Sequence, residues 1–171
     1  MSHVNFVLLV LRVGLGVSVA LHGWNKIRKG IAGTARWFDS IGMRPGQLNA
    51  YMAAGTELGG GALFAIGLFT PVAAASLIGL MVVAYWVAHK DNGFFIFNKD
   101  QGWEYVFVIA IAALMVGGIG PGEWSVDHLV GFGQNGLYSS WWGVLIALVG
   151  GLGGAAAQLA TCYRPPAKAA S

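Results

Sequence analysis

The stretch LRVGLGVSVALHGWNK, residues 11–26, decides the class of this protein. It lies in an apolar run from residue 5 to about residue 24, and about 20 apolar residues are enough for a helix to cross a bilayer. The run contains Arg12 and His22 and is followed by Lys26. An ionised group inside a bilayer costs a few kcal/mol or more unless it is paired or hydrated, so these three residues are functional candidates.

The composition of the whole chain also indicates a membrane protein. Of 171 residues, 56% are hydrophobic and 10% are charged, whereas a soluble domain carries about 25% charged residues. The basic residues behind the net charge of +3 lie beside the apolar runs, which favours contacts with anionic membrane lipids over a nucleic-acid partner. Cys162 is the only cysteine, which excludes an internal disulfide, a CxxC redox pair and a thiolate metal site.

Four further apolar runs follow the first one. The connection at residues 89–102 is aromatic in its middle and is expected to lie in the membrane interface, and residues 120–140 form a Gly-rich loop. Residues 25–47 are polar and basic and are expected to leave the bilayer. We therefore predict an all-α fold, a transmembrane helical bundle with five helices at residues 5–24, 48–68, 72–88, 103–119 and 141–161.

The basic residues fall in alternate connections of this bundle. The first-to-second connection has five Lys or Arg residues, the third-to-fourth has two and the C-terminal tail has two, whereas the other connections have none. Basic residues near helix ends stay on the cytoplasmic side, so we predict a multi-pass protein of the cell membrane, with the N-terminus outside and the C-terminus in the cytoplasm. The first run lacks a basic n-region and is long for a signal peptide, so it is interpreted as the first helix.

The ionisable residues of the first helix share a face with small residues. At 100° per residue, Arg12, His22 and Lys26 fall within a wedge of about 80°, with Gly16 and Gly23 in or next to it. A face that is both polar and small is expected to pack against other helices.

Glu57 lies near the middle of the second helix, again among small residues. Counting about 1.5 Å per residue from the outer end of each helix places Arg12 and Glu57 within about one turn of the same depth. We therefore expect an ion pair between them. The pair either only clamps two helices together or also orients or protonates a ligand.

Other polar residues admit simpler interpretations beside a functional one. Glu104, at the cytoplasmic start of the fourth helix, either lines a polar cavity with His22, Lys26 and His89 or faces water and favours the helix dipole. Lys26 could instead extend to the lipid headgroups. Two histidines on different helices could ligate haem, but nothing fixes them to face each other, so ordinary hydrogen bonding is preferred to haem ligation.

The outer loop carries Glu123, Asp127 and His128. These residues are too few and too poorly placed for a metal site, so no metal is expected there. We interpret them as turn residues whose side chains bond to nearby backbone.

The motifs of the first two helices together resemble the DoxX family of small bacterial and archaeal membrane proteins. The first helix is similar to the family pattern of Arg, Leu-Gly and His-Gly-x-x-Lys at Arg12, Gly16, His22, Gly23 and Lys26. The second, AAGTELGGGALFAIGLFTP (residues 53–71), is similar to Glu-x-x-Gly-Gly followed by Gly-Leu-x-Thr at Glu57, Gly60, Gly61, Gly67, Leu68 and Thr70.

Two later segments extend this resemblance to roughly residues 7–129. NGFFIFNKDQGWEY (residues 92–105) is similar to the family segment that ends in an aromatic residue, Glu and an aromatic residue, around Glu104. GPGEWSVDHL (residues 120–129) is similar to its Gly-x-Gly-x-x-Ser-x-Asp closure. Pro71 departs from the Arg of many relatives, and the fifth helix is an addition to the usual four.

The resemblance implies a four-helix DoxX-like domain over residues 1–129, followed by an outer loop, a fifth transmembrane helix and a short cytoplasmic tail over residues 130–171. It also implies a link to redox metabolism. Relatives are linked to quinone-coupled thiosulfate oxidation and to membrane assemblies that join superoxide dismutase and a sulfurtransferase in oxidative-stress defence. The family resemblance does not by itself imply catalysis.

The leading hypothesis is an accessory or quinone-interacting subunit of a membrane oxidoreductase assembly, in contact with membrane lipids and protein partners. His22 and Glu104 would exchange protons with a bound quinone, while Arg12 and Glu57 fix its pocket. A competing hypothesis is a scaffold without a cofactor that recruits soluble redox enzymes through its basic loop. A small transporter ranks lower, because paired broken helices are not evident. The cofactor-binding set is predicted to be Arg12, His22, Lys26, Glu57 and Glu104.

Overall fold

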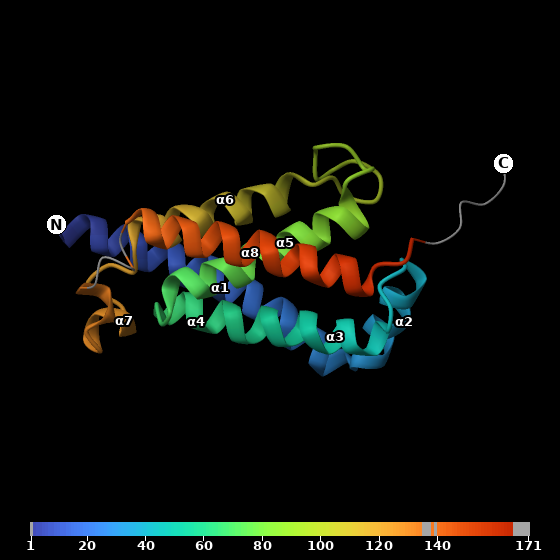
Figure 1. Ribbon diagram of the computed structural model, residues 1–171, viewed down its shortest axis with the longest axis horizontal. Helices are drawn as coiled ribbons and strands as arrows, with labels where there is room; N and C mark the ends of the chain where they lie inside the picture. Colours follow the sequence, from blue (N-terminus) through green and yellow to red (C-terminus); the bar gives the residue numbers. More distant parts are fainter. Residues whose placement is uncertain (1, 135–137, 139, 166–171) are drawn as a thin grey trace.

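A computed structural model describes residues 2–134, 138 and 140–165, and Figure 1 shows its long helices running in a common direction. The first span is α1 (Ser2–Lys29), and the second is a continuous helix made of α3 (Gly46–Gly55), η1 (Thr56–Gly60) and α4 (Gly61–Ile66). The third is α5 (Thr70–Ala84), extended by η2 (Tyr85–His89). The last two are α6 (Glu104–Ile119) and α8 (Trp141–Cys162). The shorter elements are α2 (Ile31–Ser40), α7 (Val126–Leu129) and η3 (Phe132–Gln134).

This architecture confirms the expected all-α transmembrane bundle with a fifth helix after the first four. Within the part of the chain that the structure describes, three helices are long and apolar enough to cross a membrane: His3–Lys29, Thr70–His89 and Trp141–Cys162. Glu104–Ile119 is apolar but shorter. The second span is divided by η1, a π-helical turn in which one extra residue is accommodated without breaking the helix.

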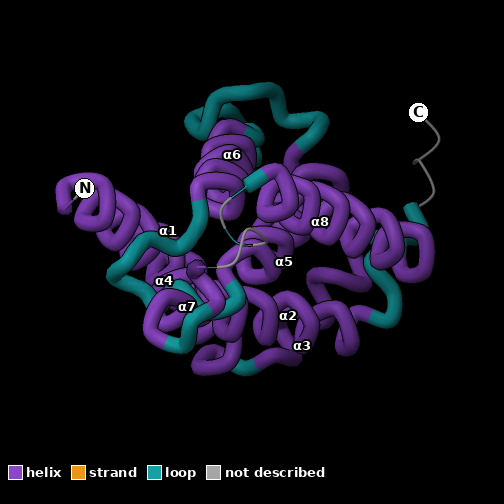
Figure 2. The backbone as a smooth tube through the Cα atoms, turned by 60° about the vertical axis from the view of Figure 1, so that its left-hand side comes forward, coloured by secondary structure: helices purple, strands orange, loops and turns teal. Residues whose placement is uncertain are grey.

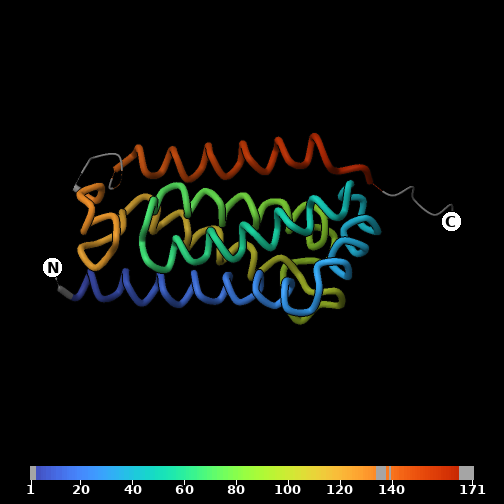
Figure 3. The backbone as a smooth tube through the Cα atoms, turned by 90° about the horizontal axis from the view of Figure 1, so that it is seen from below, coloured from blue at the N-terminus to red at the C-terminus, as the bar shows by residue number. Residues whose placement is uncertain are grey.

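The two ends of the bundle differ in charge. Figure 3 shows that α1 starts at the end that holds α7, whereas α8 ends at the opposite end, beside α2. We call these the α7 end and the basic end. The basic end carries nearly all the described cations: Lys26, Arg28, Lys29, Arg36, Arg44, Lys90, Lys99 and Arg164. Because the number of spans is odd, the N-terminal and C-terminal helices begin and finish at opposite ends of the bundle.

Local sequence sets where the helices of the α7 end begin and end. Gly67 adopts a left-handed conformation (φ 68°) and ends α4, because a residue with a Cβ is disfavoured there. Pro71 lies in the first turn of α5, where its missing N–H costs no helical hydrogen bond. Ser140 caps α8 by accepting a hydrogen bond from the Trp142 N–H at 3.2 Å.

The helix α5 forms the centre of the bundle, as Figure 2 shows with the other helices around it. It packs against α6 and α8 on one side and against η1 and α4 on the other. The bundle is therefore built from two layers, α1 with α3–α4 and α5 with α6 and α8. Of the three long apolar helices, the one containing α5 is the most covered, with 44% of its apolar window buried against 28% and 22% for the others.

Close backbone contact holds α1 against the second span. A Cβ on Gly16 would lie 2.5 Å from the carbonyl oxygen of Gly61, and a Cβ on Gly61 would lie 2.6 Å from that of Gly16. Near the basic end, a Cβ on Gly23 would lie 2.7 Å from the Ala54 carbonyl oxygen. The expected packing of the small face of the first helix is confirmed. Lipid-exposed apolar residues occupy its other side, for example Val10 and Val17.

The segment between the first two spans is more ordered than a polar loop. Helix α1 continues to Lys29, the chain turns at Gly30 with a positive φ of 92°, and α2 follows. Phe38 of α2 is buried at 7% exposure, so α2 folds back onto the bundle with one apolar face. Polar composition predicted an exit from the membrane here but did not predict this helix.

Replacing Gly16 by Ala tests the contact between α1 and α4. The new Cβ would meet backbone atoms that cannot rotate away, so the free energy of unfolding in detergent micelles should fall by about 1–3 kcal/mol.

Gly14→Ala is the matched control, because a Cβ at Gly14 meets nothing within 4 Å. It should leave stability unchanged or slightly higher, since Ala is the better helix former. Equal unfolding energies for the two variants would show that the close approach is not needed for assembly.

Candidate functional site

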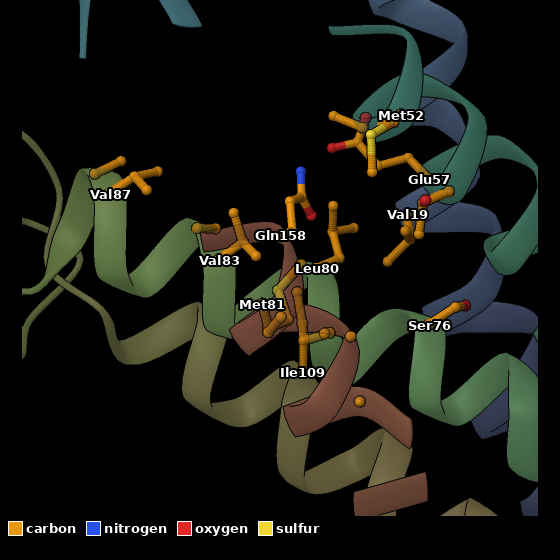
Figure 4. Close-up of a pocket in the computed structure, with 18 of the residues that line it drawn as sticks. Val19, Met52, Glu57, Ser76, Leu80, Met81, Val83, Val87, Ile109 and Gln158 are labelled. Carbon is orange, nitrogen blue, oxygen red and sulfur yellow. The ribbon is translucent and has the colours of Figure 1, made fainter. Parts of the chain in front are cut away.

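A large cavity lies between the two layers and reaches toward the basic end. Its volume is about 1080 Å³, and Figure 4 shows part of its lining, which comes from both layers. Val19, Met52 and Glu57 line it from the layer of α1 and α3, while α5 contributes a row that includes Leu80 and Val83. Most of the lining is apolar, and α6 and α8 complete the walls.

An ion pair joins α1 to the second span at the cavity wall. The Lys26 ammonium donates hydrogen bonds to both carboxylate oxygens of Glu57. The side chains are 24% and 11% exposed, so the pair is largely shielded. Gly23 lies one turn before Lys26, and its close contact with Glu57 Cβ brings the helices near enough for the pair. Lys26 therefore does not simply extend to the headgroups.

The turn η1 contains Glu57. A π-helical turn adds a residue to the helix and so rotates the residues after it relative to a regular α-helix. Glu57 is 8% exposed, which places a carboxylate inside the membrane-spanning part with Lys26 as its counter-ion. π-Helical turns are frequent at functional sites, and this one carries an ionisable side chain into the cavity.

His22 also lines the cavity. Its Nδ1 donates to the Ser18 carbonyl oxygen at 2.9 Å, within the same helix. In the neutral ring this leaves Nε2 as an acceptor. His22 is therefore a polar group of the cavity whose Nε2 can accept a hydrogen bond.

A second acid–base pair, His89 and Tyr105, was not predicted as a unit. The Tyr105 hydroxyl donates to His89 Nε2 at 2.6 Å, while His89 Nδ1 donates to the Gln101 carbonyl oxygen at 2.9 Å. All three residues line the cavity. His89 ends the second π-helical turn, η2, and Tyr105 lies in the first turn of α6. A tyrosine inside an apolar helix gives no signal in a single sequence, which is why Tyr105 was missed.

Glu104 lies outside the cavity lining, contrary to the predicted pocket. Its Oε2 accepts a hydrogen bond from the Ile96 N–H at 3.1 Å, in the loop between η2 and α6. The next residue, Tyr105, faces the cavity instead, because neighbouring helical residues are rotated by about 100°. The role of Glu104 in the structure is to hold the aromatic loop, in which the Phe94 and Trp103 rings meet at 4.7 Å.

The expected ion pair between Arg12 and Glu57 is wrong. Arg12 is fully buried near the α7 end, where it donates to the Ala65 carbonyl oxygen at 3.3 Å and to that of Trp124. The helices do not start at the same depth, because α1 extends beyond α4. Arg12 therefore lies level with Ala65, eight residues or about 12 Å from Glu57 along the second span.

Arg12 instead belongs to a clamp at the α7 end. Asp127 lies close enough to attract its charge, and a Cβ on Gly67 would lie 1.9 Å from a guanidinium nitrogen of Arg12. The glycine thus leaves the room that the guanidinium occupies. Arg12 Nε has no hydrogen-bond partner within the described part of the chain. Arg12 thus joins helices through partners other than Glu57.

Asp127 is a buried capping residue and not an ordinary turn residue. It is 0% exposed, and its carboxylate accepts hydrogen bonds from the Phe69 N–H, the Thr70 N–H and the Thr70 hydroxyl at 2.7–2.8 Å. Its own N–H donates to the Gly67 carbonyl oxygen at 2.8 Å. The carboxylate thereby satisfies the free N–H groups at the start of α5. Within the same segment, Ser125 caps α7 by accepting a hydrogen bond from the His128 N–H.

The polar residues thus form two separate groups. Arg12 and Asp127 tie α1, α4, α5 and α7 together away from the cavity. Lys26, Glu57 and His22 line the cavity from α1 and the second span, and His89 with Tyr105 lines it from the other layer. Among the residues that the structure describes, no three His, Cys, Asp or Glu side chains converge as metal ligands. Both ring nitrogens of His89 are already hydrogen-bonded, so axial ligation of haem would cost it the contact with Tyr105.

Comparison with known proteins supports the family resemblance. A model of the DoxX family matches residues 7–90, which cover most of the first span and all of the second and third. A protein of Haemophilus influenzae described as uncharacterized is 27% identical over 132 residues, covering 69% of this chain and 86% of that protein. No solved structure matches the chain. The motifs after residue 90 lie outside the matched segment.

Replacing Lys26 by Met tests the shielded ion pair. Glu57 would lose its counter-ion inside the bundle, so the free energy of unfolding should fall by about 1–3 kcal/mol. The double variant Lys26→Met with Glu57→Leu should recover much of this loss, because no charge then remains buried. Lys29→Met, at an exposed position of the same helix, is the control. Strictly additive losses in the double variant would contradict a coupled pair.

Replacing Asp127 by Ala tests the clamp at the α7 end. Three donors at the start of α5 would lose their acceptor and Arg12 its nearby counter-charge, so we expect a loss of about 3–5 kcal/mol on chemical unfolding. Glu123→Ala, at an exposed position of the same segment, should change stability by less than about 0.5 kcal/mol. A small change in the free energy of unfolding of the Asp127 variant would show that Asp127 is only an ordinary turn residue.

Proposed function

Because a model of the DoxX family matches residues 7–90, we propose that the protein is a membrane-embedded, quinone-interacting accessory subunit of an oxidoreductase or oxidative-stress assembly. The observation that carries this proposal is the cavity of about 1080 Å³, mostly apolar but with ionisable side chains on both walls. Ligand pockets are typically about 300–1,000 Å³, so the space is sufficient for a quinone ring and part of its chain.

The residues around the cavity fit the needs of a quinone. Its ring needs an apolar slot, and its two carbonyl oxygens need hydrogen-bond donors. The third proton of the Lys26 ammonium can be donated to a quinone carbonyl oxygen, whereas His22 Nε2 and the Tyr105 oxygen can accept from the hydroxyl groups of the reduced quinol; all three residues line the cavity from α1 and α6. Tyr105, His22 and Lys26 would therefore hold the ring, and Glu57 would fix the position of Lys26. Arg12 and Glu104 do not line the cavity and have no part in this proposal.

A bound quinone supplies redox chemistry by taking up two electrons and two protons. The chain would contribute the protons and their route. The Tyr105 hydroxyl would give its proton to the quinone oxygen and regain one from a protonated His89, to whose Nε2 it is hydrogen-bonded, while His89 Nδ1 donates to the Gln101 carbonyl oxygen in the exposed loop. This series of hydrogen bonds leads from the cavity toward the basic end. His89 can accept a proton on one nitrogen and release one from the other, which suits a general acid–base group.

The electrons would come from a separate oxidoreductase subunit. The basic end supports docking of such a partner, because exposed cations and Trp37 lie together on α2 and the end of α1. The positive charges of this end also favour a cytoplasmic position, with the N-terminus outside. The partner assembly, the quinone and the terminal orientation all belong to the proposal.

The same basic surface favours the second candidate, a scaffold that recruits soluble redox enzymes and binds no cofactor. The two candidates differ in what the purified protein holds. Extraction of the protein from membranes, followed by chromatography of its lipid extract, should yield bound quinone if the first candidate is right. A quinone-free protein that copurifies with soluble redox enzymes would favour the scaffold.

Replacing Tyr105 by Phe tests the proposed site directly. The variant keeps the aromatic ring but loses the hydroxyl that is bonded to His89, so a polar group of the cavity disappears. We expect the Kd of the short-chain analogue ubiquinone-1, measured by titration in nanodiscs, to rise about 3- to 10-fold.

The matched control is Tyr51→Phe, since Tyr51 is 58% exposed on α3 and does not line the cavity. Its Kd should equal that of the parent protein. An unchanged Kd for both variants would remove Tyr105 from the site, and an absence of ubiquinone-1 binding to the parent protein would overturn the proposed function.

A further inference from the structure

We propose that the cavity admits a long-chain, membrane-dissolved quinone sideways from the bilayer, through a passage between α3 and α8. In this arrangement the fifth helix, α8, forms one wall of the passage and accommodates the ligand chain. The inference rests on the proposed function, because it takes the polar part of the cavity as the site of the ring. It adds the route of entry, the length of the ligand and a role for α8.

At the basic end the passage is closed by backbone hydrogen bonds. The Arg44 N–H donates to the Cys162 carbonyl oxygen at 2.8 Å, and the Arg164 N–H donates to that of Gly42 at 2.7 Å. These bonds tie the turn before α3 to the end of α8. One turn further into the bundle, the Gln158 amide donates to Asn49 Oδ1 at 3.0 Å. A ligand therefore cannot enter between α3 and α8 from that end.

Beyond these ties the two helices separate and the cavity reaches the surface. Met52 on α3 lines the cavity and is 41% exposed, and Gly154 and Ala157 on α8 line it and are also exposed. Gly154 lies eight residues before the end of α8, or about 12 Å from it along the helix axis. That depth falls within the hydrocarbon core of a bilayer, which is about 30 Å thick. The opening consequently faces lipid chains.

The floor of the passage is α5. A Cβ on Gly79 would lie 3.0 Å from the Gly151 carbonyl oxygen, so α5 and α8 are in close contact beneath the opening. The cavity lining continues along α5 as far as Val72, which is 56% exposed near the α7 end. The space thus extends along the helix well beyond the ring-sized region around Tyr105. An elongated apolar extension that opens to lipid fits the chain of a quinone and not a compact soluble substrate.

Two adjacent glycines of α8 allow a decisive comparison. A Cβ added at Gly153 or at Gly154 meets nothing within 4 Å, so neither position is packed against another helix. Only Gly154 lines the cavity. A larger side chain at Gly154 would occupy the passage, whereas the same side chain at Gly153 would extend outside it.

The experiment compares Gly154→Leu with Gly153→Leu in nanodiscs that contain ubiquinone-10 or ubiquinone-1. We expect Gly154→Leu to weaken the binding of ubiquinone-10 by about tenfold or more, because leucine fills the space of the chain. Binding of ubiquinone-1, whose chain is short, should change less than about threefold. Gly153→Leu should bind both quinones like the parent protein, and thermal unfolding of the two variants should be alike.

The outcomes separate this inference from the proposed function. If Gly154→Leu binds ubiquinone-10 as well as Gly153→Leu does, while Tyr105→Phe still weakens ubiquinone-1, the passage is refuted and the site remains. If native mass spectrometry shows that Gly154→Leu loses phospholipid and not added ubiquinone-10, the occupant is a lipid and the inference falls. If the parent protein binds neither quinone, the proposed function itself is overturned.

Discussion

The buried guanidinium of Arg12 organises the α7 end of this protein. Inside a bilayer the guanidinium of Arg12 has no water to bind, so the protein must supply its partners. It does so with the carbonyl oxygens of Ala65 and Trp124 and the nearby charge of Asp127. Because Asp127 also accepts three hydrogen bonds from the start of α5, this clamp joins both layers of the bundle.

The need to pair buried ionisable groups also shapes the half of the bundle near the basic end. The layers meet near the α7 end, where α4 and α5 are consecutive, and enclose the cavity as they approach the basic end. Ionisable groups in that half must be paired for the same reason as Arg12, but their partners line an open space. Lys26 with Glu57 and Tyr105 with His89 are therefore stable in the membrane and accessible to a ligand of the cavity.

Both π-helical turns lie beside this cavity. The first, η1, contains Glu57, and the second, η2, ends at His89. Each turn inserts a residue into an otherwise regular helix and so changes the direction in which the next side chains point. An irregular helix costs stability, and the two irregularities coincide with the two ionisable residues that the middle spans bring to the cavity walls.

The amino-acid sequence by itself determined the class of the protein, its five helices and the small, polar face on which the first helix packs. Those properties depend on local composition and on a fixed rotation of about 100° per residue. The tertiary structure alone decided which charges meet. Arg12 does not reach Glu57 because α1 extends beyond α4, and relative helix depth is set by contacts such as that of Gly16 with Gly61. The buried role of Asp127 and the pairing of Tyr105 with His89 also depend on contacts between segments distant in sequence, which helical periodicity cannot supply.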